Sequence, residues 1–88
     1  MILLADGFDG AVLGYGRQFN KDLVVYDYER CVEILMERDG MTEEEADEYM
    51  EFNVIGAYMG EFTPVFLHRC YVETLRNMEG GEELSDGI

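Results

Sequence analysis

The sequence predicts an α+β domain in which a small antiparallel sheet of three to four strands packs against a hairpin of two helices. Two observations lead to this fold class. Short β-branched, aromatic or alternating stretches bounded by turn residues occur towards both ends of the chain, and these are typical of strands. Between them lie two stretches with helical spacing of apolar residues, separated only by residues 39–41. The 88 residues have room for one domain, which we place at residues 1–78.

Three strands are expected before the helices. The apolar run Ile2 to Ala5 is the first, and it stops at two Asp-Gly pairs within residues 6–10, which is strong turn chemistry. Ala11 to Gly16 alternates between two faces and reads as a second strand, weakened by its glycines. Leu23 to Tyr26 is β-branched and aromatic and predicts a third.

The first helix is expected to follow Asp27, a residue suited to capping a helix N-terminus. Cys31, Ile34 and Leu35 then fall on one helical stripe, with Val32 and Met36 beside it. Gly40 supplies a residue that accepts the left-handed conformation, in which many helices end.

The second helix has the clearest start signal in the chain. Thr42 and Glu45 have the spacing of a capping box, in which each side chain accepts a hydrogen bond from the other residue's backbone N–H. Helical spacing continues through Met50 and Val54, and Gly60 is the expected C-terminal stop.

The last strand is expected at Val65 to Leu67. Pro64, which lacks an N–H, suits the start or the edge of a strand. Residues 68–78 fit either a short helix or an extension of this strand, and residues 79–88 read as a flexible acidic tail. The expected core consists of Leu3, Val12, Leu13, Val25, Ile34, Leu35, Tyr49, Met50, Val54, Phe66 and Leu67.

Charge is the most unusual feature of the composition. Twenty acidic residues against six basic ones give a net charge of −14, and Lys21 is the only lysine. Such a chain is poorly suited to binding nucleic acid directly, because phosphates must be neutralised by Lys and Arg. The expected partners are basic protein surfaces or cations. An alternative is that the acidity serves only solubility or reflects a salty habitat.

Cysteine usage and hydropathy favour a cytoplasmic protein that does not enter a membrane. Cys31 and Cys70 form no CxxC pair and are expected to be reduced, buried thiols. The opening apolar run is too short for the core of a signal peptide and is followed at once by Asp6. No apolar stretch approaches the length needed to span a membrane.

No motif predicts catalysis, a cofactor or a metal. Asp6 and Asp9 lack the alternating ligand spacing of a calcium loop and are better explained as turn residues. Gly14 and Gly16 lack the third glycine and the following helix of a nucleotide-binding loop. His68, two residues from Cys70, has no recognisable third group to orient it, so a surface histidine is expected. We therefore predict a non-enzymatic protein.

The remaining candidate is the acidic face of the second helix. Helical spacing places its carboxylates opposite the apolar positions, where a row of charges can imitate the spacing of a few nucleic-acid phosphates. An ordinary solvated helix face is the alternative. The predicted partner-binding residues are Glu37, Glu43, Glu44, Asp47, Glu48 and Glu51.

A resemblance to known proteins rests on residues 25–42, 51–58 and 63–66 and on the opening Asp6-Gly7-Phe8-Asp9. These segments resemble a family of small acidic proteins encoded by phages and prophages, most of them uncharacterised. The resemblance assigns no role to any residue. It implies an accessory gene of a mobile element, a class that includes anti-CRISPR and anti-restriction proteins. Such a protein would act in the host cytoplasm by binding and inhibiting a nucleic-acid-handling host protein. The alternative is a self-associating structural module of a phage, for instance a homodimer.

Overall fold

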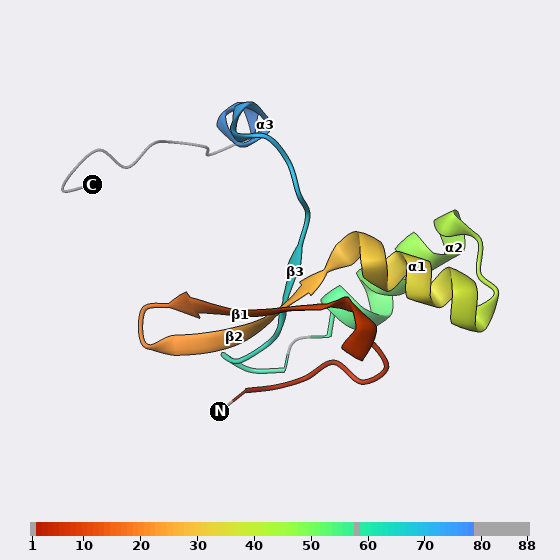
Figure 1. The fold of residues 1–88 in the computed structure, drawn as a ribbon, viewed down its shortest axis with the longest axis horizontal. Coiled ribbons are helices and arrows are strands. Elements are labelled where there is room, and N and C mark those ends of the chain that lie inside the picture. The colour runs from red at the N-terminus through yellow and green to blue at the C-terminus, as the bar shows by residue number, and fades with distance from the viewer. Residues whose placement is uncertain (1, 58, 79–88) are drawn as a thin grey trace.

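The computed structural model describes residues 2–57 and 59–78, and it has the predicted α+β class (Figure 1). The predicted tail over residues 79–88 lies outside the described part of the chain. The elements, in chain order, are the 3-10 helix η1 (Asp9–Ala11), β1 (Val12–Gln18), β2 (Lys21–Asp27), α1 (Tyr28–Asp39), α2 (Glu43–Tyr49), the π-helix η2 (Met50–Ile55), β3 (Val65–Leu67) and α3 (Val72–Asn77).

The sheet is mixed, so the prediction of an antiparallel sheet is wrong for one of its strands. Its strand order is β1-β2-β3. β1 and β2 form an antiparallel hairpin, whereas β3 pairs with β2 in parallel. β2 leads directly into the helices, and the chain returns past them to enter β3 in the same direction, as in a crossover connection. No local signal fixes this path, because the strand signal at residues 65–67 carries no direction.

The N-terminal run Ile2 to Ala5 forms no strand, which corrects a second expectation. The Ala5 N–H instead donates a hydrogen bond of 2.8 Å to the hydroxyl of Tyr26 in β2. A backbone group that bonds to a side chain cannot also belong to a strand ladder at that point.

The helix termini follow their sequence signals. The Asp27 carboxylate accepts hydrogen bonds from the backbone N–H groups of Glu29 and Arg30, and Gly40 adopts the left-handed conformation with φ of 69°. Both halves of the capping box are present, at 2.9 Å from the Thr42 N–H to Glu45 and at 3.2 Å from the Glu45 N–H to Thr42. Local hydrogen bonds and the left-handed glycine therefore fix where α1 begins and ends and where α2 begins.

Beyond Met50 the second helix widens into a π-helix, η2, and it ends at Gly56 rather than near Gly60. Gly60 does adopt a positive φ of 94°, but within the loop that precedes β3. The sequence predicts that the helix continues here without predicting its change of pitch.

The core lies between the helices and one face of the sheet. It consists of Phe8, Ala11, Val24, Tyr26, Tyr28, Cys31, Val32, Leu35, Ala46 and Met50. Leu35 and Met50 are fully buried as expected, and Leu3, Val25, Ile34, Val54 and Phe66 are half-buried.

Four predicted core residues, Val12, Leu13, Tyr49 and Leu67, are instead exposed. Leu67 lies on the sheet face that faces away from the core, and Leu13 lies where the β1–β2 register shifts. A pattern of apolar residues predicts which side chains can be buried, but burial needs a second layer over each face.

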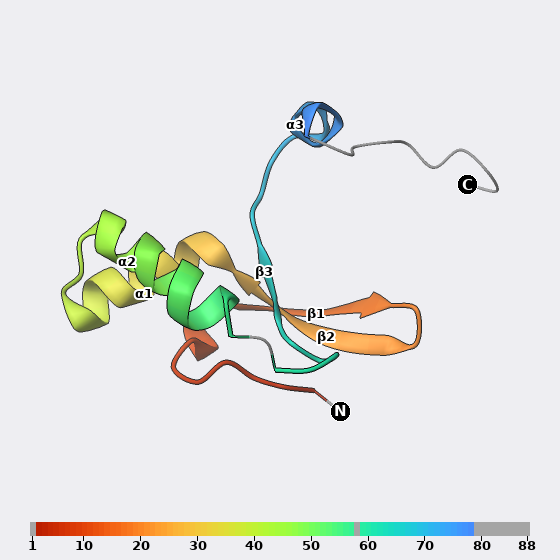
Figure 2. The same cartoon turned by 180° about the vertical axis from the view of Figure 1, so that it is seen from behind.

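The C-terminal helix α3 stands apart from the rest of the molecule, joined to β3 by residues 68–71 (Figures 1 and 2). None of its side chains is buried. Within the described chain, no helix combines the length and the apolar character needed to cross a membrane.

Candidate acidic interface

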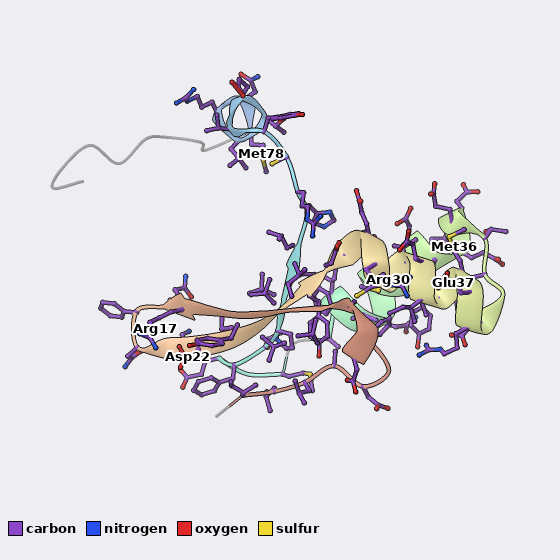
Figure 3. The ribbon with its side chains drawn as sticks, viewed as in Figure 1. Arg17, Asp22, Arg30, Met36, Glu37 and Met78 are labelled. Carbon is purple, nitrogen blue, oxygen red and sulfur yellow. The ribbon has the colours of Figure 1, made fainter. Side chains whose placement is uncertain are left out.

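A groove of about 470 Å³ runs between α1, α2 and the segment that follows β3. Its floor is apolar and is formed by Val32 and Met36 of α1. Met36 of α1 is labelled in Figure 3. Four carboxylates from the two helices surround this floor. The full lining is Tyr28, Glu29, Val32, Glu33, Met36, Glu43, Asp47 and His68.

Tyr28 of α1 lines this groove and contacts both α2 and the segment after β3. Its hydroxyl donates a hydrogen bond of 3.0 Å to Asp47 of α2, and its ring lies 4.2 Å from the ring of His68, centroid to centroid. Burial, followed by the hydrogen bond to Asp47, raises the pKa of Tyr28 to about 12. The phenol therefore stays neutral at ordinary pH and serves as a hydrogen-bond donor, not as a base or nucleophile.

The six predicted partner-binding residues fall into three groups. Glu43 and Asp47 line the groove. Glu44, Glu48 and Glu51, spaced three or four residues apart on α2 and the start of η2, are exposed and make no ion pair or side-chain hydrogen bond with described residues, although the charge of Glu51 helps to raise the pKa of Tyr28. We call these three residues the outer acidic ridge.

Glu37 is set apart from the other five. It lies on α1, where its carboxylate is 3.2 Å from the guanidinium of Arg30 (Figure 3). Its charge is thus partly neutralised within its own helix, which makes it a weaker candidate for contact with a partner than the ridge.

Glu29 and Glu33 are groove residues that sequence reasoning missed. They stand on the same side of α1 as Val32 and Met36, at the four-residue spacing of helical neighbours. That spacing is visible in the sequence, but the side of α1 that borders α2 is set by how the two helices pack. Glu33 also pairs with Arg30 at 3.1 Å.

Charge is strongly segregated along the chain. Residues 27–51 carry eleven acidic and two basic side chains, a net charge of −9. Residues 12–26 and residues 62–78 each carry two basic and one acidic side chain, a net charge of +1 with His68 neutral. Residues 27–51, which we call the helical half, are therefore the main source of the protein's negative field.

Both basic residues of the helical half are engaged in local contacts. Arg30 pairs with Glu33 and Glu37. Arg38 pairs with Asp39 at 3.1 Å, donates to the backbone carbonyl of Gly7 at 2.8 Å, and lies over the ring of Phe8. Neither guanidinium forms an ion pair with a residue of the ridge.

The other polar residues considered in the sequence do not gather into a reactive site. Asp6 and Gly7 form a turn that leads into η1, with Gly7 at a φ of 89°, and Gly14 and Gly16 lie within β1. Cys31 is buried, which raises its pKa to about 11, whereas Cys70 is exposed, contrary to expectation. In the described ranges, no group of three or more His, Cys, Asp or Glu side chains is placed to hold a metal.

Comparison with family models, with curated proteins and with solved structures finds no match to this chain.

Proposed function

We propose that this protein is a non-enzymatic binder of a basic, nucleic-acid-handling protein, which it inhibits by occupying the cationic groove that normally takes phosphates. The observation that supports this proposal is the segregation of charge, with a net −9 over residues 27–51. Direct binding to nucleic acid is disfavoured, because this field repels phosphates.

The outer acidic ridge supplies carboxylates at a suitable spacing. At about 1.5 Å of rise per helical residue, Glu44 to Glu51 extends about 10 Å. Duplex DNA presents one charge per roughly 1.7 Å of its axis, so the ridge covers the length of a few phosphates. Complementary fields would also speed the encounter with a basic partner.

The adjoining groove adds a contact that charge alone does not provide. Val32 and Met36 form an apolar floor, and carboxylates of Glu29 and Glu43 border it. An Arg or Lys side chain of the partner could pack its methylene stem on this floor while its charged end pairs with a carboxylate. Such a contact favours a folded basic surface over simple counter-ions.

The proposal is tested by capture from host lysate, followed by mass spectrometry and a competition step. Immobilised protein should retain a nuclease, polymerase or other nucleic-acid-binding protein, and retention should weaken as salt rises. Short duplex DNA added to the captured complex should displace the partner, because both ligands would occupy one groove.

A matched pair of variants separates the ridge from net charge alone. Changing Glu44, Glu48 and Glu51 to Gln should abolish capture. Changing Asp9 to Asn together with Glu61 and Glu73 to Gln removes the same amount of charge outside the helical half and should leave capture intact. Equal capture by the two variants, or a partner that DNA does not displace, would contradict the proposal.

A self-associating module is the second candidate function. The exposed apolar surface of α3 favours it, since such surfaces mark sites of protein contact. Self-association does not exclude inhibition of a partner, because the apolar surface and the acidic ridge lie on different elements.

A further inference from the structure

α3 carries an apolar stripe that nothing in its own described chain covers. Tyr71, Val72, Leu75 and Met78 recur at helical spacing, and Tyr71 is 84% exposed. Met78 is labelled beside α3 in Figure 3, away from the sheet and the other helices. α3 has six residues, no side-chain N-cap and no buried residue. Helices this short are marginal in water unless they pack against another surface.

The segment between β3 and α3 is held so that α3 projects away from its own sheet. The ring of His68 packs against Tyr28 at the start of α1, and the guanidinium of Arg69 lies 3.4 Å from Asp27. Tyr71 is extended. These contacts carry the chain past the end of the sheet instead of folding it back over the sheet's face (Figure 2).

The sheet has an apolar face that the described part of the chain leaves partly open. Val25 of β2 is in register with Val65 of β3, and Leu23 and Leu67 lie two residues along on the same face. We call these four residues the open sheet face. None of them packs against the core cluster, and Val65 and Leu67 are each 40% exposed.

The opposite face of the same strands is the one that meets the core. There Tyr26 and Phe66 stack with their ring centroids 5.4 Å apart, and Tyr26 is fully buried. Because successive side chains of a strand point to opposite faces, the open sheet face is turned away from α1 and α2.

We propose that α3 of one copy packs on the open sheet face of a second copy, and that the exchange is reciprocal, giving a two-fold symmetric homodimer. A helix on a sheet is a common layer arrangement, and here one chain supplies both layers without joining them. Reciprocal exchange covers these two apolar surfaces in both copies, so neither of the two is left open for further addition.

The distribution of charge permits a second copy as the occupant of this face. Residues 12–26 and residues 62–78 each carry a net charge of +1, whereas residues 27–51, which begin with the last residue of β2, carry −9. Contacts between α3 and the sheet thus need not bring the two strongly acidic halves together. This proposal does not depend on the proposed function, since no residue of the outer acidic ridge belongs to either surface.

Sedimentation velocity and light scattering over a wide range of concentrations test the exchange. The unmodified protein should be a dimer, and Leu75→Asp should raise the dimer dissociation constant by about ten-fold or more, because it places a charge in an apolar contact. Asn77→Asp adds the same charge on the polar side of α3 and should leave the constant nearly unchanged. A monomeric unmodified protein, or equal effects of the two variants, would overturn the proposal.

A second variant distinguishes exchange from pairing of two helices or two sheets. Val65→Thr combined with Leu67→Thr keeps β-forming side chains while making the open sheet face polar, and it should also weaken the dimer by about ten-fold. A full-strength dimer of this variant would mean that the α3 helices pair with each other, contrary to the proposal.

Isotope-filtered NMR on a mixture of labelled and unlabelled chains gives the direct readout. Methyl contacts between Leu75 and Val65 should appear between chains. Contacts seen only within one chain would show that α3 folds back on its own sheet, and the exchange would be wrong.

Discussion

At the scale of single residues, Tyr28 joins more segments than any predicted site residue does. It is the first residue of α1, its hydroxyl bonds to Asp47 of α2, and its ring packs against His68 after β3. The raised pKa of about 12 follows mainly from its burial. Tyr28 therefore links the position of the acidic helices to the direction in which the C-terminal segment leaves the sheet.

Tyr28→Phe should lower the free energy of unfolding by about 0.5–1.5 kcal/mol near neutral pH, the usual worth of one hydrogen bond. This advantage of the tyrosine should persist up to about pH 10, where phenols of the unfolded chain begin to ionise. It should then shrink towards pH 12, because the folded state holds the phenol neutral while the unfolded state releases its proton. Urea unfolding of both proteins at several alkaline pH values measures the difference, and a pH-independent difference would contradict the burial argument.

At the scale of elements, Asp27 controls the junction of β2, α1 and the C-terminal segment. One carboxylate oxygen caps α1 through two backbone N–H groups, and the other lies 3.4 Å from Arg69. Asp27→Ala should cost about 0.5–2 kcal/mol of stability, as expected for the loss of an N-cap.

Asp27→Asn separates the two roles of this side chain, because an amide oxygen still caps the helix but carries no charge for Arg69. The free energy of unfolding should fall by less than about 1 kcal/mol, in line with exposed ion pairs. Backbone relaxation measurements should nevertheless show increased motion at residues 69–71. If residues 69–71 stay as ordered as in the unmodified protein, the ion pair does not hold this segment.

The elements predicted correctly are those whose signals are local. The Asp27 cap, the Gly40 stop and the Thr42–Glu45 capping box each depend on groups within a few residues, so the sequence specifies them directly. The parallel direction of β3 could not be predicted in this way, because it depends on the course of the loop before it.

The candidate site, too, could be predicted only where its signals are local. Helical periodicity identified the outer acidic ridge and the two groove carboxylates of α2. Glu29 and Glu33 were not predicted as site residues, because their place in the groove depends on the packing of α1 against α2. The exposure of Leu67 could not be predicted for a related reason. It depends on whether another layer covers that face of the sheet, and within the described chain none does.

At the scale of the whole molecule, negative charge is concentrated over residues 27–51, and two apolar surfaces lie outside that segment. The helical half holds most of the net charge, whereas α3 and the open sheet face hold apolar side chains beside a slight positive excess. One chain could therefore use its acidic half for a basic partner and its apolar surfaces for a second copy. Salt should affect these two kinds of contact in opposite directions, because screening weakens attraction between unlike charges and relieves repulsion between like charges.

Added salt should accordingly stabilise the protein while it weakens capture of the partner. With a net charge of −14, repulsion among carboxylates lowers the stability of the folded state. The Debye length falls from about 30 Å at 0.01 M ionic strength to about 10 Å at 0.1 M, so urea unfolding at one fixed protein concentration should show a rising free energy over this range. The free energy of unfolding should rise less with salt in the variant with Glu44, Glu48 and Glu51 changed to Gln than in the variant altered at Asp9, Glu61 and Glu73. The reason is that like charges three or four residues apart on a helix repel by roughly 0.2–0.5 kcal/mol per pair. Equal salt dependence in the two variants would mean that the ridge carries no more repulsion than scattered surface acids, and its carboxylates would then lack the concentrated field on which binding to a basic groove depends.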